Sequence, residues 1–281
     1  FIEETILSVL NQNYPNLEYV IIDGGSTDNT IEIIKKYEDK ITYWVSEPDE
    51  GQADAINKGI IKCSGKIFNW INSDDLLMPH ALFEIARIYK PGHHVASKVF
   101  NRYDKTPKLN DYTQNINLNL KSFIRLESTY HQPGFWCDFD SVKHIPILTS
   151  YHYYFDKAFM LDVLRVNERI LYTEKILTLF RVHDNSKTST IQKDSSKELL
   201  DIFELFYTKN RTTNFATALN SSIKYIIKPL NHISEFKINN NNKNVPNKLL
   251  NFFVIGFLHP RLFMVRGWYT LFKNFVLRNG L

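Results

Sequence analysis

The sequence contains very little cysteine. Cys63 and Cys137 are the two cysteines in 281 residues, and neither has a CxxC partner. Disulfide frameworks and cysteine-based zinc sites need more cysteines at defined spacing. We therefore expect a protein of a reducing compartment, with a chain long enough to be stable through its hydrophobic core alone.

The sequence also lacks a long hydrophobic run. The longest mainly apolar stretch, Leu249 to Leu258, is interrupted by Asn251 and is too short to span a bilayer. A secretory signal peptide is not visible either. The chain opens at Phe1 inside a helical pattern and has no initiator Met, so we expect a fragment whose first strand is missing.

Acidic residues are scarce toward the C-terminal end. Residues 1–190 carry 21 Lys and Arg against 25 Asp and Glu, whereas residues 191–281 carry 13 against 5. From 205 to 281 there are 11 basic residues and one acidic residue, Glu235. We expect 191–281 to be a helical, basic, aromatic-rich extension, which suits either an anionic membrane surface or packing against the first 190 residues. No nucleic-acid motif accompanies it, so we expect no nucleic-acid partner.

The first 75 residues alternate between helix and strand patterns. Helices are expected over 2–10, 30–37 and 52–61, and strands over 17–22, 41–45 and 68–71. Continuous apolar runs are typical of strands covered on both faces. This order predicts an α/β fold with a mixed, mainly parallel sheet flanked by helices. Residues 93–119 indicate a loop or irregular strand, and a further strand is expected over 176–180.

Carboxylates follow three of the expected strands. Asp23, Asp49 and the pair Asp74-Asp75 fall at carboxyl ends, where open α/β sheets bind ligands. Adjacent carboxylates repel each other unless a cation lies between them, and hard oxygen ligands suit Mg²⁺ or Mn²⁺ with substrate phosphates. A turn that caps the next helix explains the same residues equally well.

Three ordered motifs resemble the nucleotide-binding half of a family 2 glycosyltransferase. They run from Asp23 to Thr30, from Ser46 to Gly59 and from Trp70 to Asp75. The resemblance is close over residues 1 to about 90 and weakens toward 188. It implies a GT-A, Rossmann-like domain over 1–190 that binds a nucleotide-diphosphate sugar, with Mg²⁺ or Mn²⁺, and transfers the sugar with inversion.

The resemblance also implies roles for single residues. Those expected to bind the nucleotide sugar are Asp23, Gly24, Asp54, Asn57, Asn72, Ser73 and Arg181. Those expected to hold the metal are Asp74, Asp75 and His183. Asn72 stands where the family usually has the first Asp of its DxD motif.

Two later segments resemble the acceptor side of the family. His131, Gln132 and Trp136 offer an aromatic and amide cluster that suits a sugar, although large aromatics are often simply core residues. Asp156 begins an expected helix and resembles the family's general base. The same carboxylate could be an ordinary helix cap.

We therefore expect an inverting glycosyltransferase, most simply using a UDP-sugar, that acts on a glycan or lipid-linked acceptor in surface polysaccharide or cell-envelope biosynthesis. A cytoplasmic protein with peripheral contact to the inner face of the membrane fits the basic extension. Two alternatives stay open: a non-catalytic sugar-nucleotide or glycan binder, and a nucleotidyltransferase.

Overall fold

The structure is a computed structural model that describes residues 1–103, 112–115, 117–184, 186 and 195–227. The chain divides into two compact units, Phe1–Thr190 and Ile191–Leu281. Each unit is described by itself.

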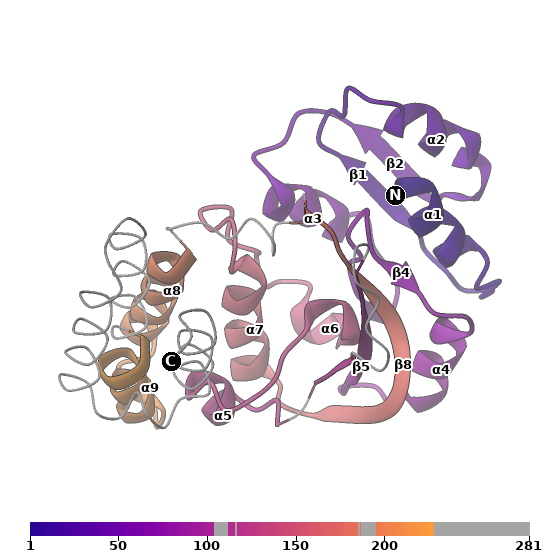
Figure 1. Ribbon diagram of the computed structural model, residues 1–281. Helices are drawn as coiled ribbons and strands as arrows, with labels where there is room; N and C mark the ends of the chain where they lie inside the picture. Colours follow the sequence, from indigo (N-terminus) through magenta and orange to yellow (C-terminus); the bar gives the residue numbers. More distant parts are fainter. Residues whose placement is uncertain (104–111, 116, 185, 187–194, 228–281) are drawn as a thin grey trace, which may run out of the picture. The chain divides into compact units, whose positions relative to one another are not determined.

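The first unit contains helices and strands in alternation (Figure 1). Its helices are α1 (Ile2–Leu10), α2 (Thr30–Lys36), η1 (Glu38–Lys40), α3 (Gln52–Ile60), α4 (Ala81–Ile88), α5 (Leu120–Ile124), η2 (Gln132–Gly134), α6 (Phe139–Val142) and α7 (Phe155–Val166). Its strands are β1 (Val20–Asp23), β2 (Tyr43–Ser46), β3 (Ile67–Phe68), β4 (Leu76–Leu77), β5 (His94–Tyr103), β6 (Tyr112–Gln114), β7 (Phe135–Asp138) and β8 (Ile170–Val182).

The strands form two sheets. β1 and β2 pair in parallel, and this register places Asp23 opposite Ser46. The larger sheet has the order β3-β7-β5-β8-β4, with β6 also paired to β5. Within it β5 and β8 are parallel, whereas the other pairs are antiparallel. The mixed sheet agrees with the prediction, but the parallel strand order expected for the first 75 residues ends after β2.

The third expected strand is much shorter than the sequence indicates. β3 pairs with β7 at Ile67 and Phe68. After Phe68 the segment is held by a side chain and not by strand pairing. The Gln132 amide donates to the Asn69 side chain at 3.0 Å and to the Trp70 carbonyl at 2.8 Å. The segment that leads to Asn72 therefore leaves the sheet early and turns toward α3.

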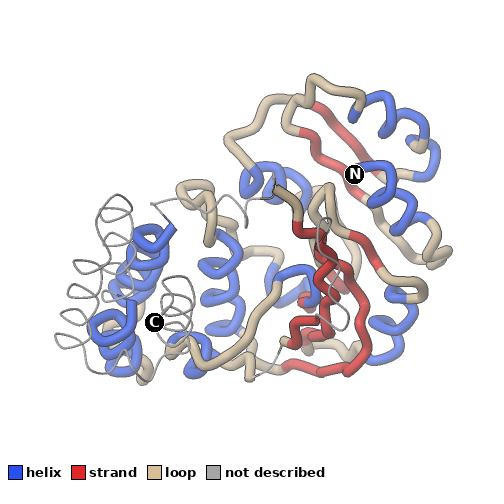
Figure 2. The backbone as a smooth tube through the Cα atoms, viewed as in Figure 1, coloured by secondary structure: helices blue, strands red, loops and turns tan. Residues whose placement is uncertain are grey.

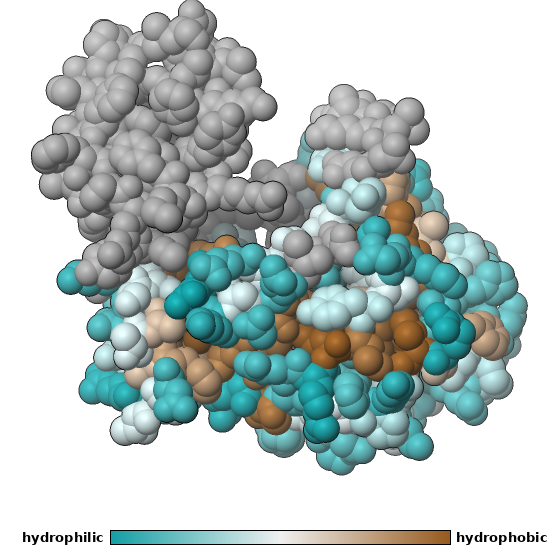
Figure 3. Space-filling view, turned by 90° about the horizontal axis from the view of Figure 1, so that it is seen from below, coloured by the Kyte–Doolittle hydropathy of each residue, from teal (hydrophilic) through white to brown (hydrophobic). Residues whose placement is uncertain are grey.

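β5 and β8 are the long central strands, and they lie side by side in Figure 2. α4 lies along one side of them, and α6 and α7 lie on the other side (Figure 1). The buried core around Ile6, Ile34, Ile85 and Val95 joins α1, α2, α4 and β5. On the face shown in Figure 3, hydrophilic residues (teal) border a band of hydrophobic ones (brown). Apolar atoms contribute much of any folded protein's surface, so this band alone indicates no binding site.

The second unit is described over residues 195–227. α8 (Ser195–Lys209) packs with α9 (Ala216–Ser222) and with η3, a short π-helix over Ile223–Ile227. These elements lie within the extension that we expected to be helical, and the rest of it, residues 191–194 and 228–281, lies outside the described residues. Among the helices described, none has both the length and the hydrophobicity needed to cross a membrane.

Candidate active site

Asp74 and His183 form the centre of the site. Asp74 lies in the turn between β3 and β4, and His183 directly follows β8. The Oδ2 atom of Asp74 is 3.0 Å from Nε2 of His183, although 109 positions separate the two residues in the chain. Both side chains are partly accessible, at 24% and 15% of their surface. The structure therefore brings together two residues that the sequence predicted as metal ligands.

Asp75 turns the opposite way and is fully buried. Its Oδ1 accepts a hydrogen bond from the backbone N–H of Arg181 at 3.0 Å, and its Oδ2 accepts one from the Asn72 amide at 2.9 Å. Burial, reinforced by the nearby charge of Asp74, raises the pKa of Asp75 to about 7. The structure thus gives Asp75 an internal hydrogen-bonding role that differs from the predicted role as a metal ligand.

Arg181 is also turned inward. Its side chain is 3% exposed, its Nε donates to the Asp74 carbonyl at 2.9 Å, and its guanidinium pairs with Glu4 of α1 at 2.5 Å. A buried guanidinium that is already paired is held by the fold rather than presented to a ligand. Arg181 therefore supports the Asp74 turn from inside the protein, and its predicted contact with the nucleotide sugar stays a prediction.

Asp23 ends β1 at the edge of the smaller sheet. It accepts hydrogen bonds from the backbone N–H groups of Gly25 and Ser26 and from the hydroxyls of Ser26 and Ser46, over 2.5–3.0 Å. Burial alone would raise its pKa, but these donors hold the pKa below its ordinary value. The carboxylate is therefore kept charged and fixed in place. Beside it, a Cβ at Gly24 would overlap the carboxylate of Asp49, so the backbone passes very close to that side chain.

Two predicted residues on α3 are engaged within the protein. Asp54 accepts from the Glu50 backbone N–H at 3.2 Å and pairs with Lys58 at 3.2 Å. Asn57 makes a reciprocal pair with the backbone of Ile147, donating to its carbonyl at 2.7 Å and accepting from its N–H at 3.0 Å. Asn57 therefore anchors the segment before α7, and a nucleotide contact for either residue stays a prediction.

The predicted acceptor residues are mostly packed inside. Trp136 is 7% exposed and belongs to the hydrophobic core, so the structure assigns its ring to packing rather than to an acceptor surface. Gln132, 8% exposed, holds Asn69 and Trp70 as described above. His131 packs edge-on against Phe180, with ring centroids 4.6 Å apart, and burial lowers its pKa to about 4.

Asp156 lies in the first turn of α7, where it accepts from the Lys157 backbone N–H at 2.8 Å. Burial and the negative charge of Asp156 together raise the pKa of Tyr130 well above its ordinary value. Asp156 is therefore close to the segment that contains His131 and Gln132.

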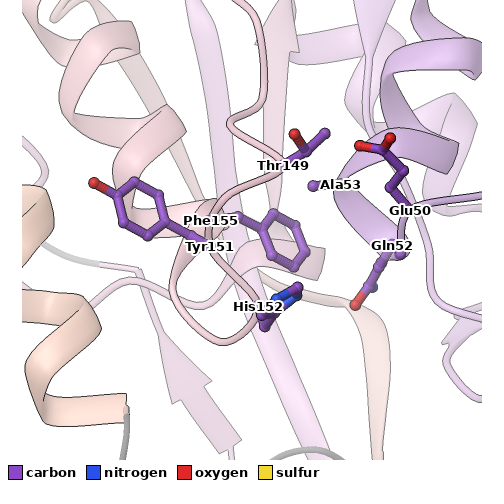
Figure 4. A pocket seen from close by; sticks show the side chains of 8 residues that line it. Glu50, Gln52, Ala53, Thr149, Tyr151, His152 and Phe155 are labelled. Carbon is purple, nitrogen blue, oxygen red and sulfur yellow. The ribbon is translucent and has the colours of Figure 1, made fainter.

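A small pocket lies between the start of α3 and the start of α7 (Figure 4). It is lined by Glu50, Gly51, Gln52, Ala53, Thr149, Tyr151, His152 and Phe155. Its volume of about 30 Å³ is enough to hold water. Figure 4 shows Phe155, the neighbour of Asp156, between Tyr151 on one side and α3 on the other.

Gln52 is a site residue that the sequence reasoning missed. It lines this pocket, and its amide donates to Oδ1 of Asn72 at 2.6 Å. It thereby links the N-terminus of α3 to the turn that carries Asp74. Its place directly after the Asp49-Glu50-Gly51 motif was the available signal, because the first turn of a helix at a sheet edge faces the ligand crevice.

The residues around Asp74 suit a divalent cation. One carboxylate oxygen and one imidazole nitrogen converge, and this donor set fits Mn²⁺ better than Mg²⁺, which prefers oxygen ligands alone. Within the described ranges, no group of three or more His, Cys, Asp and Glu side chains is placed to hold a metal. A cation at Asp74 and His183 would therefore complete its coordination with substrate phosphates and water.

A family model matches the first half of the chain. The model of glycosyl transferase family 2 matches residues 1–143 of the 281. The chain belongs to this family. An uncharacterised glycosyltransferase of Rickettsia typhi is 28% identical over 202 residues, which cover 68% of this chain and 62% of the relative. An uncharacterised glycosyltransferase of Mycobacterium tuberculosis is 39% identical over 75 residues, covering 26% of this chain and 29% of that protein. The chain thus spans less than two thirds of the length of these relatives.

Solved structures of glycosyltransferases share the fold. Staphylococcus aureus TarS, residues 1–349 in complex with UDP-GlcNAc, has a TM-score of 0.62 at 15% identity, with 91% of this chain and 76% of that chain covered. Mannosyltransferase PcManGT from Pyrobaculum calidifontis, in complex with GDP-Man and Mn²⁺, has a TM-score of 0.61 at 14% identity, covering 98% and 80%. The family and its GT-A fold, both predicted from the sequence, are confirmed.

Proposed function

We propose that this chain is the catalytic part of an inverting glycosyltransferase that uses a nucleotide-diphosphate sugar, most simply a UDP-sugar. The observation that carries the proposal is the convergence of Asp74 and His183, 3.0 Å apart, in a chain of glycosyl transferase family 2. The solved relatives with bound UDP-GlcNAc, or with GDP-Man and Mn²⁺, support a donor of this class.

In the proposed reaction, Asp156 is the general base and a divalent cation stabilises the leaving group. Asp156 accepts the proton of the acceptor hydroxyl as that oxygen attacks the anomeric carbon of the donor sugar. The bond between that carbon and the diphosphate oxygen breaks, and the nucleoside diphosphate leaves with the electron pair. A bound divalent cation supplies charge stabilisation for the leaving diphosphate. Attack from the opposite face inverts the configuration of the sugar.

Asp23 and Gly24 are proposed to contact the nucleoside, and Asn72 and Ser73 to contact the ribose or diphosphate. Asp23 is held by four donors, so its orientation costs little entropy when a ligand binds. The acceptor is proposed to be a glycan or lipid-linked hydroxyl in surface polysaccharide or cell-envelope synthesis. The basic residues from 205 to 281 are proposed to contact an anionic membrane surface at the inner face of the cell membrane.

Calorimetry with UDP, GDP and dTDP, each with and without Mn²⁺, tests the proposal. One nucleotide should bind in a metal-dependent way, and Asp74→Ala should remove that dependence. Asp39→Ala is the matched control, because it removes an exposed carboxylate from η1. If no nucleotide binds with Mn²⁺ present, the proposed site is wrong.

Activity separates an enzyme from a sugar-nucleotide binding protein. Release of nucleoside diphosphate from the matching donor sugar should be lost in Asp156→Asn while nucleotide affinity is kept. Nucleotide binding without any turnover in the unchanged chain, with glycan and lipid-linked acceptors supplied, would favour the non-catalytic alternative.

A further inference from the structure

α1 presents a row of polar side chains to the segment that carries Asp74. Thr5, Ser8 and Gln12 are spaced three and four residues apart, so they share one face of the helix. Ser8 accepts a hydrogen bond from the Leu77 backbone N–H at 3.1 Å. Gln12 donates to the Met78 carbonyl at 2.9 Å. This face of α1 therefore binds the backbone of Leu77 and Met78, which follow the Asp74 turn in the chain.

Thr5 makes the contacts closest to the metal ligand. Its Oγ1 lies 2.9 Å from the carbonyl oxygen of Ser73 and 2.9 Å from that of Asp75, so one hydroxyl is shared between the residues on either side of Asp74. Thr5 is 1% exposed. A threonine in a helix otherwise divides between two rotamers, and the contacts with the Ser73 and Asp75 carbonyls select one of them for Thr5.

Arg181 holds the remaining carbonyl of the turn. Its Nε donates to the carbonyl of Asp74 at 2.9 Å. Three consecutive carbonyl groups, those of residues 73, 74 and 75, are thus anchored from behind by Thr5 and Arg181. The backbone of Asp74 is fixed, and its side chain faces the opposite way, toward His183.

We propose that Thr5 is a positioning residue for metal and nucleotide binding, acting through the backbone on either side of Asp74. This inference rests on the function proposed above. Thr5 does not touch the ligand. It keeps the Asp74 carboxylate directed at His183 before a cation arrives, so the binding free energy is not spent on ordering the turn. Residues that orient metal ligands in this way commonly change metal affinity by about 10- to 100-fold when they are replaced.

Thr5→Val tests the proposal because it keeps the shape and removes the hydroxyl. Thr178→Val is the matched control: Thr178 is also 1% exposed and its hydroxyl also donates to a carbonyl, that of Pro133, at 2.8 Å. Both variants should lose similar stability in urea. Thr5→Val alone should weaken binding of Mn²⁺, followed by the spin-resonance signal of the free ion, by about tenfold.

Nucleotide binding gives a second readout. Thr5→Val should weaken nucleotide binding in the presence of Mn²⁺ and leave metal-free nucleotide binding unchanged. Thr5→Ser should restore the metal-dependent part, because it keeps the hydroxyl. If Thr5→Val does not fold, the pair Thr5→Ser and Thr5→Ala provides the same comparison, since these two differ by the hydroxyl alone.

The outcomes separate this inference from the proposed function. Equal Mn²⁺ affinity in Thr5→Val and Thr178→Val, with the unchanged chain binding normally, would overturn the positioning role and leave the function standing. Failure of the unchanged chain to bind Mn²⁺ and nucleotide would instead overturn both.

Discussion

The side-chain amide of Asn72 donates a hydrogen bond to the buried carboxylate of Asp75, with Nδ2 and Oδ2 2.9 Å apart. The Oδ1 of Asn72 accepts from Gln52 at 2.6 Å, so both ends of the amide are engaged. An Asp in this position, as the family resemblance would suggest, would set two carboxylates against each other without a hydrogen between them. Asn72 is therefore the residue type that a buried Asp75 requires.

The first prediction concerns this pair. Asn72→Asp should lower the free energy of unfolding by about 2 kcal/mol, because a buried carboxylate loses its donor and gains a like charge. The exchanged variant Asn72→Asp with Asp75→Asn should recover most of that loss. In it, the donor and the acceptor swap places, Gln52 still has an acceptor, and the Arg181 N–H can still donate to residue 75.

Urea unfolding of the four proteins in the cycle measures the coupling. The two single changes and the exchanged pair are compared with the unchanged chain in metal-free buffer, so that a cation cannot compensate for the repulsion. If the exchanged variant is less stable than Asn72→Asp, the hydrogen bond between residues 72 and 75 does not determine the residue types.

The second prediction concerns His183. A neutral imidazole is a ligand for Mn²⁺, so His183→Ala should weaken Mn²⁺-dependent nucleotide binding by at least about tenfold, or about 1.4 kcal/mol. His144→Ala, which removes an exposed imidazole of the same unit, is the control. Calorimetry with and without Mn²⁺ separates the two contributions. Similar losses in both variants would argue against His183 as a ligand.

The resemblance to family 2 implied that Asp74 and His183 hold one metal, and the structure places the two side chains 3.0 Å apart. The sequence did not predict the direction of the Arg181 guanidinium. That direction depends on Glu4 of α1, 177 positions away, and on a backbone carbonyl with no side-chain signal. Motif reasoning therefore identified which residues gather at the site better than which way they face.

β5 was harder to recognise for a different reason. Its first four residues are buried, yet His94 and Ser97 interrupt the apolar pattern. Each side chain makes a hydrogen bond inside the sheet: the Asp138 backbone N–H donates to Nδ1 of His94 at 3.0 Å, and Ser97 donates to the Gly134 carbonyl at 3.3 Å. Polar residues paired inside a strand conceal its periodicity. Trp136 was misleading for another reason: a large aromatic ring suits a sugar-binding surface and a hydrophobic core equally well, and here it lies in the core.

The third prediction is a dependence of stability on pH through His94. Burial lowers the pKa of His94 to about 4, from an ordinary value of 6.5. The nearby His93 also lowers this pKa, whereas the negative charge of Asp138 raises it. The unfolded chain therefore binds one more proton between pH 6.5 and 4. Stability is present above pH 6.5 and falls by about 1.4 kcal/mol per pH unit as the pH drops through that window.

His94→Asn isolates this contribution, because its amide oxygen can still accept from the Asp138 N–H. The difference in unfolding free energy between this variant and the unchanged chain should shrink steadily from pH 6.5 to 4.5. His93→Asn, at the neighbouring half-buried position, should show a much smaller change in slope. A parallel pH dependence in all three proteins would contradict a neutral, buried His94.

The fourth prediction concerns the close approach of Gly24 to Asp49. A Cβ at position 24 would overlap the Asp49 carboxylate, whose Oδ1 accepts from the Gly51 N–H at 2.8 Å just before α3. The Asp49 side chain must therefore move, which breaks its hydrogen bond with the Gly51 N–H. Gly24→Ala should cost about 0.5–1.5 kcal/mol, the contribution of one hydrogen bond, and weaken nucleotide binding, because it disturbs the turn that precedes α3.

Two further variants identify the cause. Gly59→Ala in α3 is the control, since its Cβ would lie 3.5 Å from Ile22, an ordinary contact, and alanine favours the helix by about 0.5–1 kcal/mol. Combining Gly24→Ala with Asp49→Ala removes the overlap and should return the unfolding free energy to that of Asp49→Ala alone. Urea unfolding measures each value. If the combined variant loses as much stability as the two single changes added together, the overlap with Asp49 is not the reason for glycine at position 24.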